Sequence, residues 1–142
     1  MQVAIEGNQQ LKLRVLLADT GTQLIRQLTA MLSQADWEVL SATDGFEVLC
    51  RLPELRPDVV VIAADLPRLS GIQVCSLLRQ SPDFSALPVL VLAGQNPILD
   101  KVRAKMAGAN ACLEKPFRSE ELKAAFAGLF QETGADGLPA HS

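Results

Sequence analysis

Asp19, Asp65 and Lys115 are the residues whose types and positions best suit chemistry, because each follows a short apolar run. Mg²⁺ sites in proteins often use only one or two carboxylates and keep several water ligands. Asp19 with Asp65 is therefore a candidate weak Mg²⁺ site. The interpretation we favour is structural, with Lys115 paired to Asp19 so that two strand ends are held together. The net gain from such a pair is small, because desolvating two charges offsets much of their attraction.

These residues require a scaffold that brings the ends of separate strands together. Aliphatic or β-branched runs alternate five times with segments of helical period, which is typical of a parallel sheet covered on both faces. In such sheets, ligands bind beyond the carboxyl ends of the strands. The run 58–63 is apolar almost throughout, as expected of a central strand. The predicted strands are residues 13–18, 37–42, 58–63, 89–92 and 110–113.

Helices are predicted between these strands. The helix after the second strand begins at the N-cap Asp44 and ends before Pro53. The helix of about residues 98–107 ends at Gly108, a natural C-terminal stop. Three more helices are predicted from apolar residues at three- and four-residue spacing, one from about Thr22, one from Ile72 through Cys75 to Leu78, and one from Leu122 to Phe130.

Composition excludes several classes of function. A net charge of −3 and a pI near 5.1 provide no basic face for nucleic acid. Cys50, Cys75 and Cys112 are too widely spaced for a zinc site or disulfide framework, and packing is their expected role. No run approaches the ~18 apolar residues of a membrane span, so we expect a cytoplasmic protein. We expect one domain at residues 12–131, between a leader at 1–11 and a flexible tail or linker at 132–142.

Several motifs, in order and spacing, resemble the receiver domains of bacterial response regulators over roughly residues 11–130. Residues 15–19 (VLLAD) resemble the first strand with its terminal acidic residue, and residues 42–47 (ATDGFE) resemble the start of the second helix. Residues 66–71 (LPRLSG) are similar to the loop after the phosphorylation site, and 114–117 (EKPF) to the lysine-proline motif. The resemblance implies an α/β fold, a flavodoxin-like (βα)5 doubly wound parallel sheet of strand order 2-1-3-4-5, and a cis peptide bond before the proline.

The resemblance fails at the residues that carry the family's chemistry. Phosphoryl transfer there uses an aspartate nucleophile after the third strand, an acidic pair after the first, a hydroxyl after the fourth and the lysine. When the sequence is aligned with the family pattern at Pro67, the nucleophile position is occupied by Ala63. The methyl group of alanine cannot accept a phosphoryl group. Asp19 and Lys115 are retained. Thr20 stands at the position of the second acidic residue, and Ala93 at that of the hydroxyl. Cys112 stands where the family has an aromatic switch residue in the fifth strand.

We therefore expect a pseudo-receiver of a two-component phosphorelay, which is not an enzyme and acts by phosphorylation-independent protein–protein interaction. The resemblance implies a protein partner, such as a histidine kinase or an output domain, or a second copy bound through the fourth helix, fifth strand and fifth helix. Lys101, Arg103 and Lys105 lie on or near the fourth helix. Two interpretations of this basic run stay open, a solvated face and a docking surface.

Two alternative functions remain. Asp65 would be a surrogate phospho-acceptor if its carboxylate reached the pocket, although an exposed loop aspartate ordinarily caps backbone groups. A flavodoxin-like small-ligand binder or enzyme is disfavoured, because no glycine-rich phosphate loop follows a strand and residues 94–97 (GQNP) are too short to form one. No cofactor is expected beyond weakly bound Mg²⁺.

Overall fold

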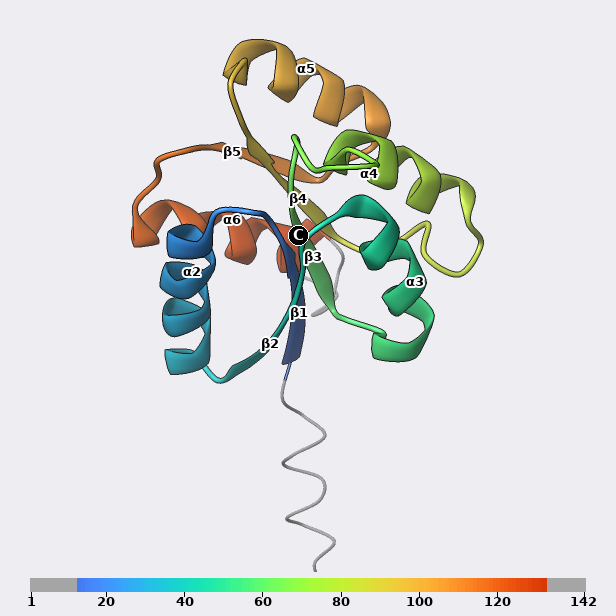
Figure 1. Cartoon of the computed structure of the whole chain (residues 1–142). Coiled ribbons are helices and arrows are strands. Elements are labelled where there is room, and N and C mark those ends of the chain that lie inside the picture. The colour runs from blue at the N-terminus through green and yellow to red at the C-terminus, as the bar shows by residue number, and fades with distance from the viewer. Residues whose placement is uncertain (1–12, 133–142) are drawn as a thin grey trace, which may run out of the picture.

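A computed structural model describes residues 13–132, which form a five-stranded parallel sheet with helices on both faces (Figure 1). The strand order is β2-β1-β3-β4-β5, so the predicted doubly wound topology is confirmed. The strands are β1 (Leu13–Ala18), β2 (Trp37–Ala42), β3 (Val59–Ala63), β4 (Val89–Ala93) and β5 (Ala111–Glu114). The helices are α2 (Thr22–Gln34), α3 (Gly45–Leu55), α4 (Gly71–Gln80), α5 (Pro97–Ala107) and α6 (Ser119–Glu132).

Two apolar clusters, one on each face of the sheet, form the core. One packs α3, α4 and α5 against the sheet, and the other packs α2 and α6 against the opposite face (Figure 1). Every residue of β3 and β4 is buried, as their almost uniformly apolar sequences require. None of the helices within residues 13–132 has the length and apolar character that a membrane span requires.

The prediction that a helix ends before Pro53 is wrong. Pro53 lies inside α3, which continues to Leu55 and ends at Arg56, a residue in the left-handed conformation with φ of 46°. Proline lacks the N–H that would close a helical hydrogen bond. Because Pro53 falls in the last turn, and the core buries Leu52 and Leu55 around it, the turn persists despite that loss.

The bounds of three predicted strands differ from the structure by one residue, at one end for β3 and β4 and at both ends for β5. β3 begins at Val59, and the side chain of Asp58, just before it, accepts the backbone N–H of Arg14. β4 continues to Ala93 and β5 to Glu114, since these two residues pair with each other in the parallel register. The difference matters for the site, because it moves the end of β5 to the residue directly before Lys115.

Residues 1–12 and 133–142 lie outside the described part of the chain, and so does the predicted leader at residues 1–11. The predicted tail does as well, except for residue 132, which ends α6. Both segments stay predictions.

Candidate functional site

The parallel register brings the predicted site residues to one edge of the sheet. Ala18 pairs with Ile62, Ala63 with Leu92, and Ala93 with Glu114. The residues that follow these pairs along β1, β3, β4 and β5 therefore lie at the same carboxyl edge, where binding sites form in open parallel sheets.

Asp19 and Lys115 form an ion pair at this edge. The ammonium Nζ of Lys115 donates to Oδ2 of Asp19 at 2.8 Å. The Asp19 side chain is only 3% exposed, and that of Lys115 is 33% exposed. Oδ1 of Asp19 accepts the backbone N–H of Gly21 at 2.8 Å, so each carboxylate oxygen already has a donor. The pairing predicted from the sequence is present, and so is a cis peptide bond between Lys115 and Pro116.

The residues between these charges are small and apolar. Ala63 ends β3 with 3% exposure, and Ala93 ends β4 fully buried. The carbonyl of Ala63 lies so close to Gly71 that any Cβ at position 71 would collide with it, which explains the glycine at the start of α4. Thr20 is exposed at the end of β1. At this edge, β3 and β4, which lie between β1 and β5 in the sheet, therefore end in methyl groups.

Cys112 lies on β5, next to α5, and is half-buried. Burial raises the pKa of its thiol, because the thiolate is disfavoured away from water, and the charge of Lys101 lowers it only in part. A raised pKa keeps the sulfur protonated at neutral pH. Cys112 packs against the core and Cys75 is buried within it, as the sequence predicts. The same prediction is wrong for Cys50, which is exposed.

Asp65 lies against the β4–α5 loop. It is exposed, and a Cβ at Gly94 would collide with its Oδ2. Glycine at position 94 therefore leaves space for this carboxylate. Within residues 13–132, no three side chains of the types that bind metals are grouped closely enough to hold an ion.

Asp100, which the sequence interpretation missed, organises the same loop. It is 4% exposed, and its Oδ2 accepts the backbone N–H of Gly94 at 2.8 Å. An acidic residue in the first turn of a helix is a common stabilising feature, and this position of Asp100 is the one sign of its role that the sequence contains. That signal does not reveal that the side chain folds back onto the loop.

The loop between β3 and α4 is fixed at its far end. The hydroxyl of Ser70 accepts the N–H of Gln73 at 3.1 Å, while Oε1 of Gln73 accepts the N–H of Ser70 at 2.9 Å, which is a complete capping box. Arg68 lies 5.0 Å from the centre of the Phe46 ring. Asp65 is therefore carried by a loop that is pinned to both α3 and α4.

Comparison with known proteins identifies the family. Residues 15–127 match the family model of the response regulator receiver domain. The chain belongs to this family. PilG of Pseudomonas aeruginosa is 30% identical to this receiver domain over 110 residues, which are 78% of this chain and 82% of PilG. The response regulator MprA of Mycobacterium sp. strain KMS is 37% identical over 126 residues, which are 89% of this chain and 54% of MprA, so the chain spans about half of that relative.

Solved structures resemble this receiver domain over most of its length. A response regulator from Chloroflexus aurantiacus has a TM-score of 0.78 and 32% identity, and the match covers 82% of this chain and 95% of that one. The receiver domain of the histidine kinase PA1611 from Pseudomonas aeruginosa has a TM-score of 0.75 and 24% identity, covering 86% and 98% of the two chains. It was crystallised with a magnesium ion in its active-site cleft, and at this identity its likeness to the present chain concerns the fold alone.

Proposed function

We propose that this receiver domain is a pseudo-receiver, which acts in two-component signalling by protein–protein interaction and accepts no phosphoryl group. The observation that best supports the proposal is the buried methyl group of Ala63 at the end of β3, where the family alignment expects the acceptor. A methyl carbon has no lone pair with which to attack phosphorus. Ala93, the residue at the expected hydroxyl position, likewise offers no hydrogen bond from its side chain to a phosphoryl oxygen.

The ion pair supports the same proposal. Lys115 adds positive charge where a family member would hold a phosphoryl group, but here it is bound to Asp19. A magnesium ion would have to compete with Lys115 for Asp19, and Mg²⁺ gives up its water ligands reluctantly. We therefore propose that Mg²⁺ binds only weakly through Asp19 and Asp65. Calorimetric titration of Mg²⁺ into the wild-type chain and an Asp65→Asn variant measures the contribution of Asp65, and we expect the variant to bind Mg²⁺ more weakly.

A row of exposed apolar side chains on α5 supports interaction as the remaining activity. Ile98, Val102 and Met106, which we call the α5 stripe, are 80%, 51% and 82% exposed. Their four-residue spacing puts them on one side of the helix. Large exposed apolar groups beside charged ones are typical of protein-binding surfaces. The stripe therefore favours docking as the role of the basic run on this helix.

The partner expected for this surface is a protein with an apolar centre and an acidic rim. The exposed basic side chains Lys101, Arg103 and Lys105 surround the α5 stripe, so an acidic rim would be electrostatically complementary. A histidine kinase or an output domain with such a surface fits this chemistry. A second copy of this chain would bring the same stripe to a two-fold interface.

A photo-activated cross-linking residue in place of Val102 tests this surface. We expect it to capture one partner, or a second copy, in cells, whereas the same residue in place of Leu77 should not. Leu77 is a matched control because it is a similarly exposed apolar residue, 42% exposed, on α4. The purified partner should then bind the wild-type chain equally well with and without acetyl phosphate and Mg²⁺. Binding that requires the phosphodonor, or equal capture from both positions, contradicts the proposal.

The second candidate function is phosphorylation of Asp65 as a surrogate acceptor. Its carboxylate is exposed near the carboxyl edge of the sheet. Phosphoryl transfer needs near-attack geometry between the carboxylate, the metal and the donor. Asp65 is directed at Gly94, on the β4–α5 loop. Phosphoryl incorporation that disappears in the Asp65→Asn variant would favour this second function.

A further inference from the structure

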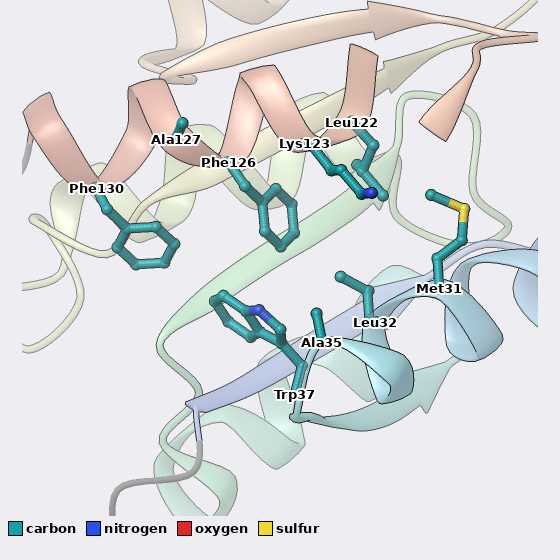
Figure 2. Close-up of a pocket in the computed structure, with 9 residues that line it drawn as sticks. All are labelled: Met31, Leu32, Ala35, Trp37, Leu122, Lys123, Phe126, Ala127 and Phe130. Carbon is teal, nitrogen blue, oxygen red and sulfur yellow. The ribbon is translucent and has the colours of Figure 1, made fainter. Parts of the chain in front are cut away.

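An apolar hollow of about 190 Å³ lies between α2 and α6, on the face of the sheet opposite α3, α4 and α5 (Figure 2). Trp37 at the start of β2 faces Phe126 and Phe130 of α6, with ring centroids 5.2 and 5.5 Å from its own. Met31 of α2 lines the other side. Among the described residues that line the hollow, Lys123 is the only charged one.

The hollow leaves apolar surface in contact with water. Trp37 and Met31 are only half-buried, although their neighbours Leu32 and Phe126 belong to the core. Covering such surface is favourable by about 25 cal/mol for each Å² removed from water. An occupant that is apolar and narrow enough for the space between two helices would therefore be stabilised there.

The chain enters the described fold beside this hollow. Leu13, the first residue of β1, pairs with Trp37 in the register between β1 and β2. The preceding residues 1–12 contain the apolar triplet Val3-Ala4-Ile5, followed by Gly7 and Asn8, residue types that favour chain reversal. A reversal at this point would direct the triplet back toward the helices.

The reach of this segment is sufficient. Val3 lies ten positions before Leu13, and an extended chain advances about 3.3 Å per residue. The wall from Leu122 to Phe130 rises only about 12 Å at 1.5 Å per helical residue. Residues 133–142 follow the end of α6 in the sequence, but their only large apolar residue is Leu138. The N-terminal triplet therefore fits the hollow better than the C-terminal segment does.

We propose that Val3-Ala4-Ile5 packs into the hollow between α2 and α6 of its own chain, against Trp37 and Phe126. This inference is independent of the pseudo-receiver proposal, because it concerns the opposite face and a different segment. Trp37 is the only tryptophan in the sequence, so its fluorescence reports directly on the occupancy of the hollow.

The test compares acrylamide quenching of Trp37 fluorescence in the full chain, a Val3→Ser/Ile5→Ser variant and a matched Gln9→Ser/Gln10→Ser control. Far-UV circular dichroism checks that all three are folded. We expect the Val3→Ser/Ile5→Ser variant to show a larger quenching constant and a red-shifted emission, because its tryptophan loses an apolar cover. The control should match the wild type. Deletion of residues 2–10, which leaves β1 intact, should reproduce the effect.

Three outcomes would overturn the inference. The first is unchanged quenching in both the serine variant and the deletion. The second is a larger quenching constant in a chain that is truncated after residue 132, together with unchanged quenching in the N-terminal variants. That result would assign the hollow to the C-terminal segment. The third is a quenching constant that falls as protein concentration rises, to the same extent in the wild type and in the N-terminal variants. That result would assign the hollow to a second copy of the chain.

Discussion

Replacing Lys115 with methionine is expected to lower the free energy of unfolding by about 2 kcal/mol, because it leaves a buried carboxylate without its positively charged partner. Asp19 is 3% exposed and loses the ammonium group 2.8 Å from its Oδ2. Breaking a fully buried ion pair typically costs about 3–5 kcal/mol. The expected loss is smaller here, since Lys115 is one-third exposed and water can partly replace it. Urea denaturation followed by circular dichroism measures the change.

Two further variants separate this effect from a general loss of positive charge. Lys105→Met removes an exposed lysine from the last turn of α5 and should change stability by no more than about 0.5 kcal/mol. The double variant Asp19→Asn/Lys115→Met should recover most of the loss, because the remaining neutral side chain is cheaper to bury than a charge. Equal stability of Lys115→Met and Lys105→Met would mean that the ion pair has no structural role.

Replacing Arg79 with alanine is expected to cost about 3 kcal/mol, because one guanidinium group satisfies several backbone carbonyls at once. Its Nε donates to the carbonyl of Gly108 at 2.8 Å, and its Nη1 to that of Leu87 at 2.8 Å. Nη2 donates at 2.9 Å to Oδ1 of Asn110, which also accepts the N–H of Val89. Arg79 thereby joins α4 to the beginnings of β4 and β5 and to the end of α5.

Arg79→Lys and Arg103→Ala are the matched controls for this experiment. Lysine keeps the charge but cannot donate along three directions from a planar group, so Arg79→Lys should lose most of the same stability. Arg103 is exposed on α5, and its replacement should change the midpoint of urea denaturation very little. A small effect of Arg79→Ala would show that water satisfies these carbonyls equally well.

The sequence predicts the features of this fold that depend on local pattern. Alternating apolar runs were sufficient to predict the five strands, and the resemblance to receiver domains supplied their order. The positions of the strand ends were sufficient to bring Asp19 and Lys115 together. The helix through Pro53 was not predictable from local rules, because tertiary burial of Leu52 and Leu55 outweighs the lost hydrogen bond. Propensity is a weak guide wherever packing of this kind decides.

The residues that sequence reasoning missed act through long-range contacts with the backbone. Asp100 reaches back six residues to the N–H of Gly94, and Arg79 reaches the carbonyl of Gly108, 29 residues away. Backbone groups are the same at every position, so no residue type in the sequence marks them as partners. The hollow beside Trp37 was missed for a related reason, since aromatic residues at helical spacing on α6 indicate a core face whether or not that face is fully covered.

The most direct test of the pseudo-receiver proposal is the intact mass of the full chain after incubation with acetyl phosphate and Mg²⁺. The triple variant Thr20→Asp/Ala63→Asp/Ala93→Thr, which restores the residue types that the family uses, serves as the positive control. We expect no added phosphoryl group on the wild-type chain and a measurable fraction of phosphorylated triple variant. A stable phosphoryl group on the wild-type chain, lost in the Asp65→Asn variant, would contradict the pseudo-receiver proposal.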